Sequence, residues 1–104
     1  MLSLNENEAN KLIYNNPGKL IIIDCFAKWC GPCKAIAPYV DQLEGFYGNS
    51  ILVGKVDVDE CDIFTNKYNI TLMPTFLFFK DGIELTRVLG ADMNTVNEMI
   101  RRNI

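Results

Sequence analysis

The stretch LIIIDCFAKWCGPCK, residues 20–34, predicts a buried strand that leads directly into a helix carrying two cysteines. Its first part, residues 20–23, is an aliphatic and mostly β-branched run, which is typical of a strand in the interior of a sheet. Beyond the second cysteine, Ile36 and Val40 recur at the spacing of one face of a helix. Cys30 is therefore expected at the N-terminus of that helix.

The pair Cys30 and Cys33 has the arrangement of a redox site. Free backbone N–H groups and the helix dipole stabilise an anion at a helix N-terminus, so Cys30 is expected to react as a thiolate. Cys33 lies one turn further in, where we expect it to be more shielded and still able to reach the first sulfur. Gly31 permits a tight backbone, and Pro32 suits the first helical turn and limits the freedom lost on disulfide closure. The motif predicts thiol–disulfide exchange.

A Cys-x-x-Cys pair can also be half of a zinc site or part of a structural disulfide. Zinc needs two further donors, yet the chain has no histidine, and Cys25 and Cys61 are isolated in sequence, so no metal is expected. A chain of 104 residues that is 49% hydrophobic can build a core without cross-links, which disfavours a disulfide-stapled secreted domain. The lack of histidine also excludes Cys–His hydrolase chemistry within the chain.

The length of the chain predicts one domain over residues 1–104. A net charge of −3 does not favour nucleic acid or an anionic membrane as partner. The apolar run at 20–23 is interrupted by Asp24 and is too short to span a bilayer. The first eight residues have neither a basic region nor an apolar region of an export signal, so a cytoplasmic, reducing compartment is expected.

The rest of the chain predicts alternating helices and strands. Asn5 and Glu8 form a helix-capping pattern, Asp81-Gly82 is a hairpin signal, and Asp92 is placed to cap a last helix. The predicted elements are a very short strand at 2–4, a helix from Asn5 that ends at 15–18, strand 20–26, a kinked helix at about 33–47 containing Pro38, strand 51–57, a short helix at 61–68, strands 75–80 and 83–88, and the helix after Asp92. This order implies a mixed sheet with helices on both faces.

Several motifs in this order resemble those of thioredoxins over essentially the whole chain. They are the hexapeptide WCGPCK at 29–34, Asp24 six residues before the first cysteine, Pro38, Lys55, Met73-Pro74-Thr75, Gly82 at the hairpin turn and Gly90 before the last helix. The resemblance implies an α/β thioredoxin fold, in which a central mixed β-sheet of four to five strands is flanked by four α-helices. It also implies a protein without a bound cofactor.

The resemblance also implies roles around the dithiol. Asp24 stands in an apolar strand, so we expect it to be buried with a raised pKa, and by similarity it is the general base for Cys33 with Lys55 as its partner. Pro74 matches the cis-proline of the family, and the backbone of Met73 is then expected to hydrogen-bond an extended substrate. The active-site loop comprises Trp29, Gly31, Pro32 and Lys34, and the substrate-binding surface comprises Trp29, Pro32, Met73, Pro74, Gly90 and Ala91.

Plainer interpretations of these positions stay open. Asp24 is also compatible with local hydrogen bonding, Lys55 with a solvated lysine, and Trp29 with ordinary core packing. Cys25 stands where the family usually has a bulky apolar residue, and burial in the strand favours an inert thiol. Cys61 is a candidate for a regulatory or dimerising role at the start of a helix, although neighbouring carboxylates oppose its thiolate.

The leading hypothesis is a protein-disulfide reductase in which Cys30 attacks a substrate disulfide and Cys33 resolves the mixed disulfide. The resemblance implies a monomer that is re-reduced by a flavoprotein thioredoxin reductase using NADPH, with clients such as peroxiredoxin, ribonucleotide reductase and methionine sulfoxide reductase. One alternative is a disulfide oxidase or isomerase on the same fold, although Gly31-Pro32 between the cysteines favours the reducing end of the range. The other is a redox-dependent binding module.

Overall fold

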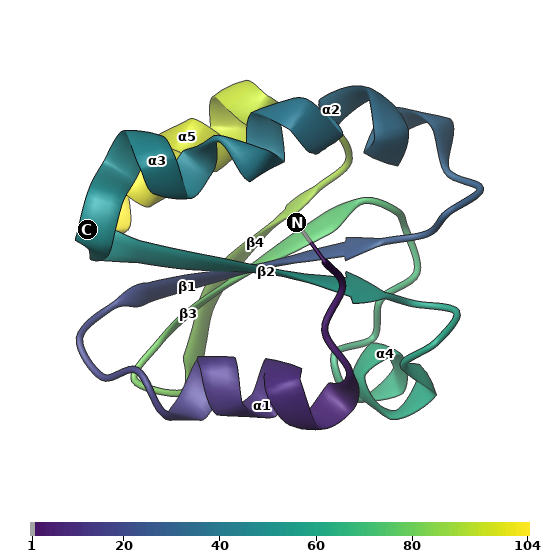
Figure 1. The fold of residues 1–104 in the computed structure, drawn as a ribbon, viewed down its shortest axis with the longest axis horizontal. Coiled ribbons are helices and arrows are strands. Elements are labelled where there is room, and N and C mark those ends of the chain that lie inside the picture. The colour runs from purple at the N-terminus through teal and green to yellow at the C-terminus, as the bar shows by residue number, and fades with distance from the viewer. Residues whose placement is uncertain (1) are drawn as a thin grey trace.

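Two central strands, apolar on both faces, form the middle of a four-stranded sheet in the computed structural model, which describes residues 2–104 (Figure 1). β1 (Leu20–Phe26) and β3 (Thr75–Lys80) are buried along nearly their whole length, as expected where helices cover both faces of a sheet. β2 (Ile51–Asp57) and β4 (Ile83–Leu89) flank them in the order β2-β1-β3-β4. β1 runs parallel to β2, and the other two pairings are antiparallel, so the predicted mixed sheet is confirmed.

Helices cover the two faces of this sheet. They are α1 (Glu6–Tyr14), α2 (Gly31–Asp41), α3 (Leu43–Tyr47), α4 (Asp62–Lys67) and α5 (Met93–Asn103), with a 3-10 turn at Gly48–Ser50. In Figure 1, α2, α3 and α5 lie on one face, and α1 and α4 lie on the other. β1 alternates accordingly, because Leu20 and Ile22 pack in the core cluster of α2, α3 and α5, whereas Ile21 and Ile23 pack in that of α1.

The local signals that predicted the elements are present as expected. The N–H of Glu8 donates to Oδ1 of Asn5 at 2.8 Å, and the N–H of Asn5 donates to Oε1 of Glu8 at 2.9 Å, which completes a capping box. Asp92 accepts a backbone N–H from the first turn of α5. Asp81 and Gly82 have φ values of 52° and 80°, the left-handed backbone that a tight hairpin turn requires.

The helix predicted at about 33–47 is divided in two, so residues 2–104 contain five α-helices where four were expected. It begins at Gly31, and α2 ends at Asp41 before α3 starts at Leu43. Pro38, where we predicted the kink, lies inside α2. At the break the N–H of Gln42 donates to the carbonyl oxygen of Tyr39, only three residues back, and this tighter pattern separates the two helices.

The strand predicted at 2–4 is reduced to a single bridge. Ser3 pairs with Lys55 in parallel, and the N–H of Leu4 donates to the carbonyl oxygen of Lys55 at 2.7 Å. One bridge is too short to form a fifth strand, so the sheet has the lower of the two expected strand numbers. No helix within residues 2–104 is long and apolar enough to cross a membrane.

Candidate active site

The two cysteines of the hexapeptide lie at the N-terminus of α2, as predicted. Cys30 is the N-cap residue of α2, and Pro32 stands in its first turn. The cysteines are joined by a disulfide bond with their Cα atoms 5.3 Å apart. The backbone N–H of Cys33 donates to Sγ of Cys30 at 3.2 Å. A helix-terminal N–H is thus aimed at the Cys30 sulfur, where it favours a thiolate after reduction.

The prediction that Cys33 is the more shielded sulfur is wrong for this disulfide-bonded form. Both cysteine residues are 5% exposed, and both belong to the same core cluster. The two still differ in their surroundings. Sγ of Cys30 lies 3.6 Å from the carbonyl oxygen of Met73, whereas Cys33 lies within α2 and lines a pocket beneath it. Position in the helix, rather than exposure, distinguishes the two sulfurs.

Two loops from distant parts of the chain surround the dithiol. The Met73–Pro74 peptide bond is cis, as the resemblance implied. The N–H of Gly90 donates to the carbonyl oxygen of Pro74 at 2.8 Å, which joins the loop after β4 to the loop before β3. Pro74 is buried, and Met73 and Gly90 are half-buried. Other positions of the predicted site are exposed, namely Gly31, Pro32, Lys34 and Ala91.

Trp29 lies on the surface beside the dithiol, so the core-packing interpretation is wrong. Its side chain is 66% exposed, and its indole Nε1–H donates to Oδ2 of Asp59 at 2.8 Å. Asp59 is positioned in turn by Asp57, whose Oδ1 accepts its N–H at 2.9 Å. Our sequence interpretation did not give Asp59 this role. The parallel pairing of β1 and β2 could have indicated it, because parallel strands end at the same edge of the sheet.

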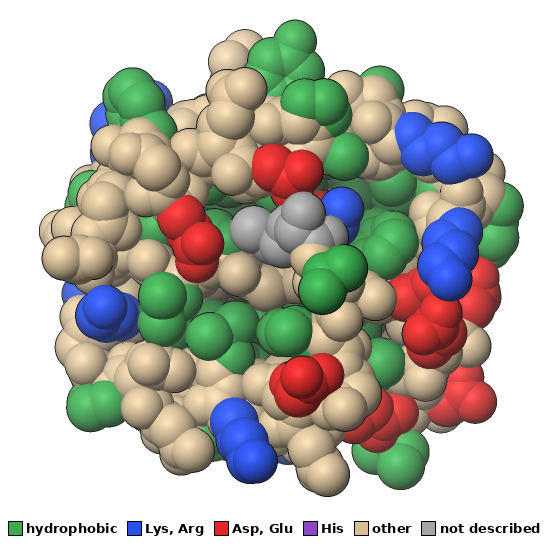
Figure 2. Space-filling view, viewed as in Figure 1, with side chains coloured by type: hydrophobic (Ala, Val, Ile, Leu, Met, Phe, Trp, Pro, Cys, Tyr) green, Lys and Arg blue, Asp and Glu red, His purple; other side chains and the backbone are tan. Residues whose placement is uncertain are grey.

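The edge beside Trp29 is rich in charge. On the face shown in Figure 2, acidic side chains gather over the end of β2 and the start of α4, with basic side chains next to them. Lys28 Nζ lies 3.0 Å from Oε1 of Glu60 and 4.0 Å from Oδ2 of Asp57, which is 2% exposed. One flank of the dithiol is therefore predominantly acidic and exposed to a partner.

Asp24 is a buried carboxyl on the face of the sheet that α2 covers. It is 1% exposed and follows Ile22 by two residues, so it shares the face on which Ile22 packs against α2. Burial raises its pKa to about 7, partly offset by the positive charge of Lys55 and increased by Asp41. Within the described residues its Oδ1 has no hydrogen-bond partner. Local hydrogen bonding therefore does not account for this oxygen, and the carboxyl can exchange a proton near neutral pH.

Lys55 is the strand neighbour of Asp24 rather than its ion-pair partner. The two residues are paired in the β1–β2 register, and the lysine charge acts on the carboxyl. In the described part of the chain they form no salt bridge, because Nζ of Lys55 lies over the Phe26 ring, 4.7 Å from its centroid. Lys55 and Cys33 line one pocket of about 270 Å³. This pocket brings Cys33 together with the strand neighbour of Asp24.

The other two thiols lie in the interior. Cys25 is fully buried in the core cluster that includes α1, and burial together with the charge of Asp24 raises the pKa of its thiol. Cys61 is 2% exposed at the start of α4, with Sγ 3.6 Å from the carbonyl oxygen of Leu4. Burial, followed by the charge of Glu6, raises its pKa, so the helix N-terminus does not produce a thiolate. These surroundings are typical of unreactive cysteines.

Among residues 2–104 no group of three or more His, Cys, Asp or Glu side chains is placed to hold a metal ion. The chemistry that the described site offers is therefore that of its two sulfurs.

Known proteins resemble this chain in sequence and in fold. The family model described as Thioredoxin matches residues 1–102. A thioredoxin of Echinococcus granulosus is 45% identical over 85 residues, which are 82% of this chain and 78% of that protein. Thioredoxin 1 of Plasmodium falciparum is 41% identical over 95 residues, covering 91% of this chain and 88% of that protein. The X-ray structure of Fasciola hepatica thioredoxin superimposes with a TM-score of 0.90 at 43% identity, covering 96% of this chain and 95% of that one.

The residues matched by the family model extend over nearly the whole chain and include the disulfide-bonded pair at the start of α2. Thioredoxins are thiol–disulfide oxidoreductases, and the sulfur pair described above is the group that such a reaction needs. The chain belongs to the thioredoxin family.

Proposed function

We propose that this chain reduces disulfides in client proteins with Cys30 as the nucleophile and Cys33 as the resolving residue. Protein-disulfide reductase activity follows from membership of the family and from the Cys30–Cys33 pair. The order of attack is supported by one contact above all, the N–H of Cys33 that donates to Sγ of Cys30 at 3.2 Å. This donor lowers the free energy of a thiolate at Cys30, and the thiolate is the attacking species.

In the first step the Cys30 thiolate attacks one sulfur of the client disulfide. A new bond forms between Cys30 and that sulfur while the client disulfide breaks. The other client sulfur leaves as a thiolate and takes a proton from the solvent. Cys30 and the client are then joined as a mixed disulfide.

In the second step Cys33 gives its thiol proton to Asp24, and the new thiolate attacks the Cys30 sulfur. The mixed disulfide breaks, the Cys30–Cys33 disulfide forms, and the second client sulfur leaves as a thiolate that takes up a proton. Two electrons pass from the dithiol to the client. The role of Asp24 is supported by its pKa of about 7 and by its position on the face covered by α2. Lys55 tunes this pKa through its charge.

The client is held by the surface around the sulfurs. An extended client segment beside the loop before β3 can hydrogen-bond the backbone of Met73, whose carbonyl oxygen lies 3.6 Å from Sγ of Cys30. Exposed Trp29, held by Asp59, supplies an apolar wall. The rest of the binding surface comprises Pro32, Pro74, Gly90 and Ala91, with Gly31 and Lys34 completing the loop.

Thioredoxins carry no bound cofactor, so reducing equivalents reach this chain through its thiols. We propose a flavoprotein thioredoxin reductase using NADPH as the electron donor, and clients of the peroxiredoxin, ribonucleotide reductase and methionine sulfoxide reductase classes. A reducing compartment, the cytoplasm, suits this direction of transfer, and we propose that the single domain acts there as a monomer. Burial of Cys25 and Cys61 supports the monomer, because neither thiol is exposed for an intermolecular disulfide.

The roles are tested by serine variants and by a redox titration. Cys30→Ser should abolish insulin reduction, and Cys33→Ser should accumulate a stable mixed disulfide with insulin that dithiothreitol releases. Accumulation on the Cys30→Ser variant instead would reverse the assigned roles. A midpoint for the Cys30–Cys33 couple more oxidising than the glutathione pool would contradict the reductase direction and support the oxidase or isomerase.

A further inference from the structure

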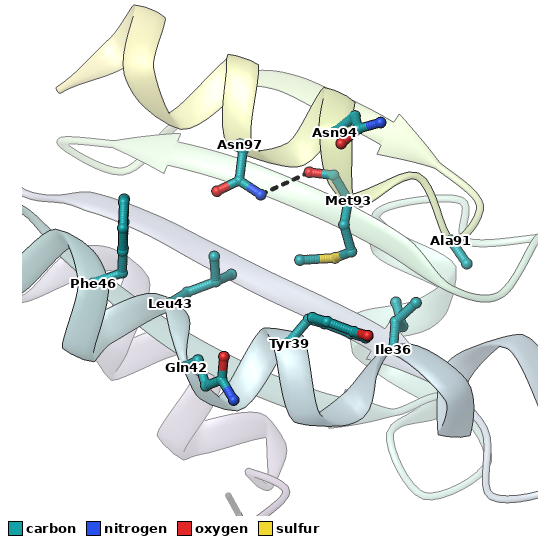
Figure 3. A pocket seen from close by; sticks show the side chains of 9 residues that line it. All are labelled: Ile36, Tyr39, Gln42, Leu43, Phe46, Ala91, Met93, Asn94 and Asn97. Carbon is teal, nitrogen blue, oxygen red and sulfur yellow. Dashed lines mark hydrogen bonds between the residues drawn. The ribbon is translucent and has the colours of Figure 1, made fainter.

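A groove separates α2 and α3 from α5 on the face of the sheet that carries the dithiol helix (Figure 3). It has a volume of about 490 Å³, and none of the nine residues that line it carries a charge. Two aromatic residues of its lining, Tyr39 and Phe46, are 61% and 79% exposed. Figure 3 shows the side chain of Met93 reaching from α5 toward α2 and α3. Apolar side chains gathered in an open groove commonly mark a contact surface.

The polar residues of the groove include two that are available to a ligand. Asn97 is engaged within the protein, because its Nδ2–H donates to the carbonyl oxygen of Met93 at 2.9 Å and its Oδ1 accepts the Tyr47 hydroxyl at 2.7 Å. Gln42 and Asn94 are exposed, and their side chains make no hydrogen bond within residues 2–104. Each side-chain amide can donate to and accept from the backbone of a bound polypeptide.

One end of the groove is continuous with the surface around the dithiol. Ala91 lines the groove and directly follows Gly90, whose N–H is bonded to Pro74. Ile36 also lines the groove and lies one helical turn beyond Cys33 on α2. A client whose disulfide is held at the cysteines has a polypeptide segment on each side of its reacting cysteine. This end of the groove is open to one of these two segments.

We propose that the groove binds the client polypeptide next to its reacting disulfide through one uncharged, apolar side chain of the size of leucine or phenylalanine. Gln42 and Asn94 bond the client backbone on either side of that side chain. The inference rests on the proposed function, since the client must first be held at Cys30. The uncharged lining disfavours an acidic or basic client side chain, because no opposite charge in the groove would offset the free-energy cost of desolvating it. Continuity with the dithiol surface favours the client over a second copy of the chain.

The test compares the double variant Tyr39→Ser/Phe46→Ser with the wild type on three kinds of substrate. One is a series of disulfide-linked peptides that carry leucine at successive positions beside the cysteine. The second is the matching series with serine in place of leucine, and the third is the small disulfide DTNB. We expect kcat/KM for the best leucine peptide to fall roughly fivefold to tenfold, through KM, because the lost contact lies away from the reacting atoms. Rates with the matching serine peptide and with DTNB should not change.

Ile83→Ser is the matched control, because Ile83 is 65% exposed and lies at the other end of β3 from Pro74. It should leave all rates unchanged. Equal losses on DTNB and on the leucine peptide, or equal wild-type rates with the two peptides, would overturn the proposal. Unchanged leucine-peptide kinetics in the double variant would overturn it as well. If sedimentation then shows a wild-type dimer that the double variant loses, the groove binds a second copy of the chain. A wild type inactive on DTNB and peptides alike would instead refute the proposed function.

Discussion

Replacing Asp24 by asparagine should remove a large pH dependence of stability. The folded protein holds the proton of Asp24 up to a pKa of about 7, whereas the unfolded chain loses it near the ordinary value of 3.8. Between these values the folded state binds more protons, so the free energy of unfolding falls as pH rises. The rise of the pKa from 3.8 to about 7 corresponds to about 4 kcal/mol at 25 °C. Below pH 3.8 and above about pH 7 this contribution is flat.

The measurement is urea unfolding of the disulfide-bonded wild type and of Asp24→Asn from about pH 3.5 to pH 8.5, followed by far-ultraviolet circular dichroism. Oxidised protein is used because Cys30 and Cys33 then do not titrate. The difference between the two curves should change by about 4 kcal/mol across this interval, in favour of the variant at high pH. The unpartnered amide of asparagine lowers the stability of the variant equally at every pH, so it does not affect the shape of that difference.

Asp62→Asn, at an exposed aspartate, is the control and should not reproduce the difference curve. A flat difference curve for Asp24→Asn would refute the assignment of a raised pKa to this carboxyl. The same variant should resolve a preformed mixed disulfide at least about tenfold more slowly, since the proton acceptor for Cys33 is lost. If the resolution rate is unchanged while the free energy of unfolding shows the expected pH-dependent difference, Asp24 is buried with a raised pKa but takes no part in the mechanism.

Three further results are expected. Asn5→Ala removes the side chain that accepts the Glu8 N–H and should lower the free energy of unfolding by about 1 kcal/mol, whereas an unchanged urea midpoint would mean that the capping box contributes nothing. Phe78→Ala opens a cavity at a fully buried position and should cost about 3–5 kcal/mol in the same assay; a loss below 1 kcal/mol would indicate that the core refills. Cys25 and Cys61 should react with DTNB only after unfolding, and rapid native labelling of either would contradict its burial.

Local sequence predicted most of the fold, because its signals act over a few residues. The continuous apolar run of β1 indicates a buried strand, the capping box begins a helix, and the Asp81-Gly82 turn closes a hairpin, each through residues close in sequence. The predicted secondary structure is wrong at two elements whose form depends on contacts with other parts of the chain. The strand at 2–4 has one partner residue and forms a bridge, and the helix at about 33–47 divides at Gln42 through a hydrogen bond that the sequence pattern does not reveal.

The sequence by itself determined which residues enter the proposed mechanism, namely the cysteine pair at a helix N-terminus and a carboxyl within an apolar strand. Only the tertiary structure decided how they are surrounded. It placed the carbonyl of Met73 against Cys30, the indole of Trp29 on Asp59, and the amine of Lys55 over an aromatic ring rather than on a carboxylate. It also left the groove between α2 and α5 open. These contacts join residues far apart in the chain, so they depend on strand order and helix placement, which the interactions of the whole core fix together.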